Sequence, residues 1–191
     1  DGFGHRITPV PDLNGDGTAD VMVQALWDDE GGVGYQGSVW VVYLEGGDGA
    51  GGASTPPGLW SWEKISTESC GLSLPGVGAS STRWGEVGGF MGDLDGDGLP
   101  EVAVGNPMDD DGGTHSGALH MLTLNTSTWN SAGYEAKLPL VEDWRKYSNV
   151  SDPTTLGVAQ GDAWQTFLTL VPVDIDRDGR RELVFSLYTA D

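Results

Sequence analysis

Three nine-residue loops in this chain carry oxygen-bearing side chains at alternate positions. They occupy residues 12–20, 93–101 and 174–182 and follow the pattern Asp-x-(Asn/Asp)-x-Asp-Gly-x-x-(Asp/Glu). Calcium is a hard cation that takes about six to eight oxygen ligands, and alternate side chains of a curled loop can converge on one ion. The glycine at position 6 permits the sharp turn that this curl requires. The pattern therefore predicts calcium binding, against the alternative of an ordinary Asp/Gly turn between strands.

Each loop predicts four side-chain ligands and one backbone carbonyl, so the chain is expected to bind about three Ca²⁺ ions. The first set is Asp12, Asn14, Asp16 and Asp20, with the carbonyl of Thr18. The second is Asp93, Asp95, Asp97 and Glu101, with the carbonyl of Leu99, and the third is Asp174, Asp176, Asp178 and Glu182, with the carbonyl of Arg180. The first loop has one carboxylate fewer than the others and is predicted to bind more weakly.

The loops belong to a longer internal repeat. Asp12, Asp93 and Asp174 are separated by 81 residues in each case, and a fixed interval of this kind indicates a repeated structural unit. A short apolar triplet follows each loop, at residues 21–23, 102–104 and 183–185. The sequence therefore predicts repeats at residues 1–81 and 82–162 and the start of a third at 163–191, all within one β-repeat domain.

The elements that position these loops are predicted to be strands. The chain has 31 glycines and ten prolines among its 191 residues, its apolar runs are short and β-branched, and amphipathic helical periodicity is absent from the sequence. These features predict an all-β fold with many turns. Because the loops lead into β-branched triplets, and position 12 is Val23, Val104 or Phe185 in place of a glutamate, an EF-hand is excluded.

An aromatic-glycine pair precedes the first two loops, as Phe3-Gly4 and Trp84-Gly85, and Gly105-Asn106-Pro107 follows the second. With the calcium loops and flanking strands, these motifs resemble the FG-GAP repeat of integrin α-subunit β-propellers. The resemblance implies that each repeat is a four-stranded propeller blade, with an ion clamping the hairpin between its first two strands. A closed propeller needs about four to eight blades, so about two and a third repeats imply a partial propeller or an open repeat array.

The net charge of the chain limits the kinds of partner that it is expected to bind. Its formal net charge of −20 argues against nucleic acid and against an anionic membrane surface, and its apolar runs are too short for a transmembrane segment. Unpaired strand edges would allow an oligomer or a filament. The remaining candidates for a partner are a protein or glycan ligand, or copies of the chain itself.

Several isolated features carry weaker predictions. Asn125 and Asn149 begin N-glycosylation sequons, which fit an extracellular or cell-surface location. Trp62 is expected to pack in the core or between repeats, with a sugar platform as the alternative. Acidic triplets at residues 28–30 and 109–111 are interpreted as solvated loops, with a second cation or partner site as the alternative.

The sequence offers no nucleophile paired with a base and no carboxylate pair apart from the loops, so an enzyme is not predicted. The preferred interpretation is an extracellular calcium-binding β-repeat protein with a structural role in adhesion, recognition or assembly. One alternative is an accessory module of a secreted carbohydrate- or lipid-processing enzyme. A second alternative is the protomer of an extracellular fibre.

Overall fold

The computed structural model describes residues 2–29, 34–46, 58–66, 82–111, 114–125, 141–148, 170–177 and 182–185. For residues 59, 60, 170–173 and 182–185 it describes the backbone alone. The sequon asparagine Asn149 lies outside these ranges, and the predicted repeat boundaries at residues 81 and 162 remain predictions. The described part of the chain contains no helix long and apolar enough to cross a membrane.

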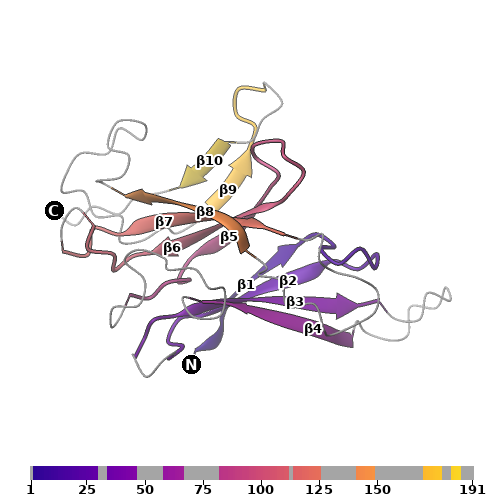
Figure 1. Ribbon diagram of the computed structural model, residues 1–191, viewed down its shortest axis with the longest axis horizontal. Helices are drawn as coiled ribbons and strands as arrows, with labels where there is room; N and C mark the ends of the chain where they lie inside the picture. The colour runs from indigo at the N-terminus through magenta and orange to yellow at the C-terminus, as the bar shows by residue number, and fades with distance from the viewer. Residues whose placement is uncertain are drawn as a thin grey trace.

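The described residues form β-strands joined by turns and bends (Figure 1). The first sheet holds β1 (Phe3–Val10), β2 (Asp20–Ala25), β3 (Ser38–Glu45) and β4 (Gly58–Ile65). The second holds β5 (Gly88–Gly92), β6 (Glu101–Asn106), β7 (Ala118–Leu124) and β8 (Val141–Ser148). A hairpin follows, of β9 (Leu170–Val173) and β10 (Glu182–Phe185). Neighbouring strands are antiparallel, so the predicted all-β fold is confirmed.

The two four-stranded sheets repeat each other in register. Val21 pairs with Val42 in the first sheet, and Val102, which lies 81 residues after Val21, pairs with Leu122 in the second. Each sheet follows the order of its sequence, so every connection joins neighbouring strands. A four-stranded meander is the form of blade that the resemblance implied.

The core lies between the two sheets. Strand residues alternate between the two faces of a sheet, and Val39, Val41 and Tyr43 of β3 are at most 1% exposed. They belong to one apolar cluster with Val104 and Leu122 of the second sheet. The first strands of successive units lie side by side, since β5 contacts both β1 and β9. This arrangement of neighbouring sheets around their first strands is that of a partial propeller (Figure 1).

Backbone bonds join the two sheets at Trp84, which is fully buried. The Trp84 N–H donates to the carbonyl of Gln36 at 2.9 Å, and the Thr82 hydroxyl donates to the same carbonyl at 2.9 Å. Gly37, at φ +84°, is the residue that makes this approach possible. A Cβ atom at Gly37 would lie 2.0 Å from the Trp84 carbonyl oxygen, so only glycine fits at this position.

Candidate metal centres

Each acidic loop connects the first two strands of its unit. Residues 12–19 lie between β1 and β2, and residues 93–100 lie between β5 and β6. The last ligand position of each loop is the first residue of the second strand, which is Asp20 in β2 and Glu101 in β6. The predicted strand-to-strand position of these two loops is therefore confirmed, and the strand pairing fixes both ends of each loop.

The first aspartate of each loop organises the turn through backbone hydrogen bonds. The Asp12 carboxylate accepts from the N–H of Gly15 at 2.7 Å and of Gly17 at 2.6 Å. The Asp93 carboxylate accepts the same two bonds, from the glycines three and five residues later, at 2.7 and 3.0 Å. These four glycines have φ between +80° and +92°. They place successive N–H groups toward one carboxylate, which curls the loop.

The last carboxylate ties the end of each loop back to its beginning. Asp20 Oδ2 accepts from the N–H of Leu13 at 2.9 Å, and Glu101 Oε2 accepts from the N–H of Leu94 at 2.7 Å. Both carboxylates are buried, with 1% of Asp20 and 4% of Glu101 exposed. One oxygen of each buried group therefore has a backbone partner.

The two loops differ in the second oxygen of this carboxylate. Asp20 Oδ1 accepts from the N–H of Leu44 at 2.9 Å. Glu101 Oε1 is buried and has no hydrogen-bond partner of acceptable geometry among the described residues. The Thr123 side chain interacts with the Glu101 carboxylate and lowers its pKa, but it does not satisfy this oxygen. Burial raises the pKa of both groups, and the negative charges of other aspartates in the same loop raise it further. An unsatisfied buried carboxylate oxygen is costly, and a bound cation would remove that cost.

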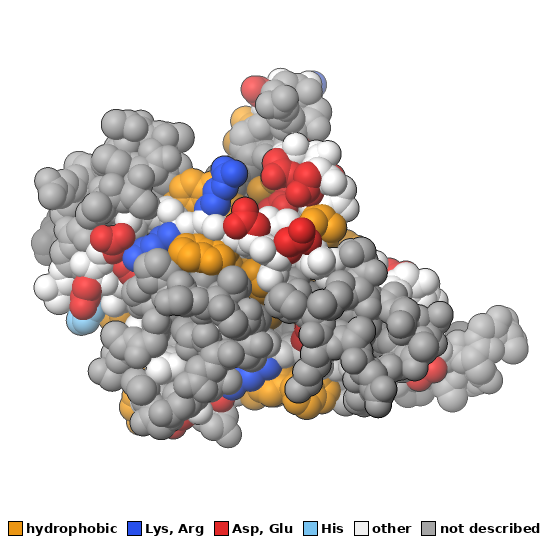
Figure 2. Space-filling model, in the orientation of Figure 1, with side chains coloured by type: hydrophobic (Ala, Val, Ile, Leu, Met, Phe, Trp, Pro, Cys, Tyr) orange, Lys and Arg blue, Asp and Glu red, His pale blue; other side chains and the backbone are white. Residues whose placement is uncertain are grey.

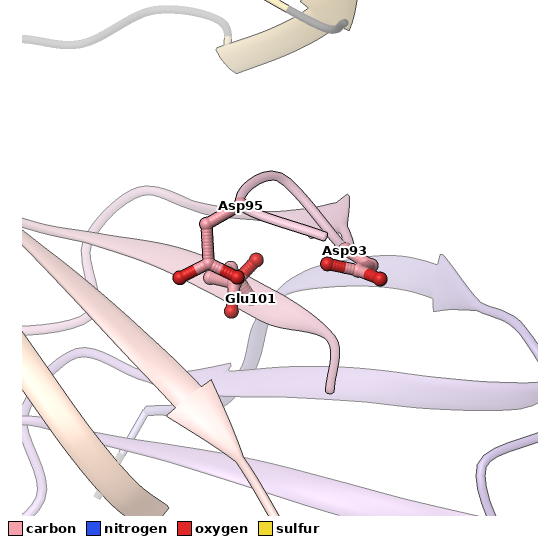
Figure 3. A group of neighbouring side chains, drawn as sticks. All are labelled: Asp93, Asp95 and Glu101. Carbon is pink, nitrogen blue, oxygen red and sulfur yellow. The ribbon is translucent and has the colours of Figure 1, made fainter. Parts of the chain in front are cut away.

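Three carboxylates meet in the second loop. One ligand oxygen each from Asp93, Asp95 and Glu101 lies within 4.8 Å of the other two. Figure 3 shows the Asp95 carboxylate next to that of Glu101, with Asp93 facing them from the beginning of the loop. On the face shown in Figure 2, acidic side chains gather near the end of the molecule where the β5–β6 connection lies. An all-oxygen group of this kind suits a hard cation such as Ca²⁺.

The carboxylates of the first loop are less closely grouped than those of the second loop. In the described part of the chain, only the second loop brings three carboxylates within 4.8 Å. In the first loop Asn14 stands at position 3, where its amide nitrogen lies 3.4 Å from Asp16 Oδ2 and its amide oxygen accepts from the N–H of Asp16 at 3.0 Å. The first loop thus has the same backbone curl as the second with one negative charge fewer.

The third loop is described in part. Asp174 is half-buried and Asp176 is exposed, and the backbone of Glu182 pairs with Val173 at the base of the β9–β10 hairpin. Asp178 and Arg180 lie outside the described residues, so this ligand set remains a prediction. The described part does place the loop between two antiparallel strands, as in the first two units.

The acidic triplets are not solvated loops throughout, which corrects the interpretation made from sequence. The Asp109 side chain is fully buried, and the Lys146 Nζ of β8 donates to its Oδ1 at 2.8 Å. The Lys64 Nζ of β4 lies 2.5 Å from Asp28 Oδ2 in the first unit. The two lysines cap equivalent turns and tie the outer strand of each sheet to the turn before β3 or β7. Sequence reasoning missed them, although the pattern Trp-x-Lys occurs at residues 62–64 and again at 144–146.

The exposure of one aromatic side chain, that of Trp62, also differs from the prediction. Trp62 is 52% exposed, so it is not a core residue, and its ring centroid lies 4.8 Å from that of Trp40 on the same face of the first sheet. Among the histidines, His120 is fully buried near Trp84 and Trp144, and His5 and His115 are exposed. His120 is thus a residue of the core, and His5 and His115 are surface residues.

Comparison with known proteins matches the repeats found above. Residues 3–42 and 90–121 match the FG-GAP repeat family. The chain carries FG-GAP repeats. It is also similar to integrin alpha-7 of Rattus norvegicus, with 34% identity over 125 residues, which is 64% of this chain and 9% of the relative. Integrin alpha-7 of Mus musculus is 34% identical over 111 residues, which is 58% of this chain and 8% of the relative.

The two FG-GAP matches contain the loop at residues 12–20 and the loop at 93–101. The chain spans less than a tenth of the length of these integrin relatives. What the comparisons establish for this chain is therefore an integrin α-like, all-β repeat module.

Proposed function

We propose that this FG-GAP chain is a calcium-stabilised module of an extracellular or cell-surface adhesion or recognition protein. Its role is structural, and its partner is a protein or glycan ligand or another copy of the chain. The observation that carries the calcium assignment is the second loop. Three carboxylates lie close together there, and the buried Oε1 of Glu101 has no hydrogen-bond partner of acceptable geometry among the described residues.

The residues of the second loop fit a calcium ion in kind and in number. Asp93, Asp95, Asp97 and Glu101 offer carboxylate oxygens, and Leu99 offers its carbonyl. The ion would offset the repulsion among these carboxylates and supply the buried Glu101 oxygen with a partner. Because Glu101 is the first residue of β6, binding there would fix the loop to the strand that follows it. We extend the proposal to the first and third loops, for about three ions.

This arrangement gives calcium a role in stability. The loop joins β5 to β6, and β6 lies in the middle of the second sheet between β5 and β7. An ion that binds only the folded loop stabilises the folded state by mass action. Calcium would thereby hold the module rigid, and the connections between the strands would remain available to a ligand.

The test is a comparison of Glu101→Gln with Glu142→Gln. Glu142 lies on β8 and is exposed, so its substitution is the matched control. We expect Glu101→Gln to weaken calcium binding at one site at least about tenfold, since it removes a ligand charge, and Glu142→Gln to leave the isotherm unchanged. In saturating calcium, Glu101→Gln should melt below the unsubstituted chain, and in excess chelator this order should reverse. Glu101→Gln should then melt at or above the unsubstituted chain, because it removes an uncompensated buried charge.

An identical calcium isotherm for Glu101→Gln and the unsubstituted chain would overturn the assignment of this loop. Loss of folding in both calcium and chelator would indicate that the Glu101 carboxylate is needed for folding independently of a metal.

A further inference from the structure

Asn14 and Gly15 form the one Asn-Gly dipeptide of the sequence, and they lie in the first acidic loop. Asparagine is chemically labile, because the backbone nitrogen of the next residue can attack its side-chain amide carbon. A glycine in that place has no Cβ atom to hinder the attack. Gly15 is exposed and Asn14 is half-buried, so water reaches the dipeptide. The pair therefore has the composition and the solvent access that loss of the amide group requires.

The first loop holds the reacting groups of this dipeptide together. The Asn14 amide oxygen accepts from the N–H of Asp16 at 3.0 Å, and the ring that this bond closes contains both Asn14 Cγ and the Gly15 nitrogen. A backbone N–H at this oxygen also stabilises the negative charge that attack on Cγ places there. The Gly15 N–H donates to Asp12 Oδ1 at 2.7 Å, which is within reach for proton transfer. The electrophile, the nucleophile and a proton acceptor thus lie within one turn.

The second loop has the same turn without the amide. Its N–H groups at positions 4 and 5 make the same two bonds, at 2.7 and 3.1 Å. Asp95 stands there in place of Asn14, and an ionised carboxylate is a poor electrophile with no ammonia to lose. The fully buried Asn106 precedes Pro107, whose nitrogen carries no hydrogen. Both positions are therefore internal controls for the reactivity of Asn14.

We propose that Asn14 is a deamidation site of the calcium-free first loop. The Gly15 nitrogen forms a bond to Asn14 Cγ and gives its proton to Asp12. The bond from Cγ to Nδ2 then breaks, and the amide nitrogen takes a proton and leaves as ammonia, so the product is a cyclic succinimide. Water opens this ring to aspartate where the bond from Cγ to nitrogen breaks, and to isoaspartate where the backbone bond breaks. Nothing is oxidised or reduced.

Each product changes how the first loop binds calcium. Aspartate at position 14 gives the loop the same number of carboxylates as the second loop, which should raise its affinity. Isoaspartate adds a methylene group to the backbone ahead of Gly15, which should displace the N–H groups that curl the loop around Asp12. Calcium should suppress the reaction, because Asp12 and the Asn14 amide oxygen would then be ligands. This suppression rests on the proposed function, whereas the reaction in chelator does not.

Peptide mapping by mass spectrometry tests the proposal on the 191-residue chain. The chain is incubated in excess chelator below its melting transition, in saturating calcium, and in parallel with a synthetic peptide of residues 9–19. In chelator the fragment with Asn14 should gain about 1 Da, since it exchanges ammonia for water. Its rate should at least equal that of the peptide, because the loop holds the reacting groups together. Calcium should slow the gain at least about tenfold, and fragments with Asp95 or Asn106 should keep their mass.

Two matched substitutions identify the nucleophile. Gly15 and Gly96 have φ of +80° and +82°, and a Cβ atom at either would meet nothing within 4 Å. Gly15→Ala should slow deamidation of Asn14 at least about tenfold, and Gly96→Ala should leave its rate unchanged. Equal rates in these two variants would overturn the proposal. So would a rate in the folded chain in chelator more than about tenfold below that of the peptide. Equal rates in calcium and in chelator would keep the deamidation site and count against calcium binding by the first loop.

Discussion

Substitution of Gly37 tests the contact between the two sheets. Gly37→Ala would place a Cβ atom 2.0 Å from the Trp84 carbonyl oxygen, in a backbone conformation of φ +84°. Left-handed geometry alone costs about 1–2 kcal/mol for a residue with a side chain. Relief of the overlap must separate the sheets and break the bonds from Trp84 N–H to Gln36 and from Arg83 N–H to Tyr35, each worth about 0.5–1.5 kcal/mol. The expected loss in the free energy of unfolding is about 2–5 kcal/mol.

Gly4 supplies the matched control for this experiment. It has nearly the same conformation, at φ +86°, but a Cβ atom there would meet nothing within 4 Å. Gly4→Ala should therefore cost only the backbone term of about 1–2 kcal/mol. Urea unfolding of both variants in saturating calcium, followed by tryptophan fluorescence and far-UV circular dichroism, measures the difference. Equal losses for the two variants would refute the claim that Gly37 is needed for close approach of Trp84.

Two further predictions concern the lysines that cap the acidic turns. Lys146→Met should lower the free energy of unfolding by about 3–5 kcal/mol, because it leaves the fully buried Asp109 side chain without its charge partner. Lys64→Met should lower it by about 1 kcal/mol, because the Asp28 side chain is 15% exposed and can be hydrated. Equal losses of the two variants in chemical unfolding would contradict this order. Burial alone would raise the pKa of Asp28, but hydrogen bonds from Lys64 and Ser38 and the charge of Lys64 lower it below its ordinary value of 3.8. The stability that comes from this lowered pKa is present above the unfolded-state pKa and is lost as the pH falls through the folded-state pKa. Asp28→Asn should therefore flatten the pH dependence of the melting temperature below about pH 4. An unchanged pH dependence in this acidic range would exclude Asp28 as a contributor.

The loops and their strands were predictable because the information is local. The spacing of oxygen-bearing residues and the glycines at positions 4 and 6 encode the curl, and the β-branched triplet after each loop encodes the strand. The equivalence of the first two strands of each sheet was also foreseeable from the 81-residue interval. Phe3 and Trp84 were identified as equivalent from sequence, and the structure places them in equivalent chains of aromatic contacts.

The tertiary ion pairs were not predictable in the same way. Lys146 lies 37 residues from Asp109, in the part of the repeat where the two units resemble each other least. Only sheet pairing brings β8 beside the turn that precedes β7. The exposure of Trp62 depends likewise on tertiary packing, because the local sequence does not determine which face of a sheet is covered. The buried, unsatisfied oxygen of Glu101 also required coordinates, since Asp20 at the equivalent position satisfies both of its oxygens.

The central claim is that calcium binds the acidic loops and thereby stabilises the folded sheets. Calcium titration by isothermal calorimetry, paired with thermal unfolding in calcium and in excess chelator, tests it most directly. The account predicts about three sites, with the first loop the weakest, and a melting temperature that falls when calcium is removed. A melting curve that is identical in calcium and chelator, with no heat of calcium binding, would contradict it.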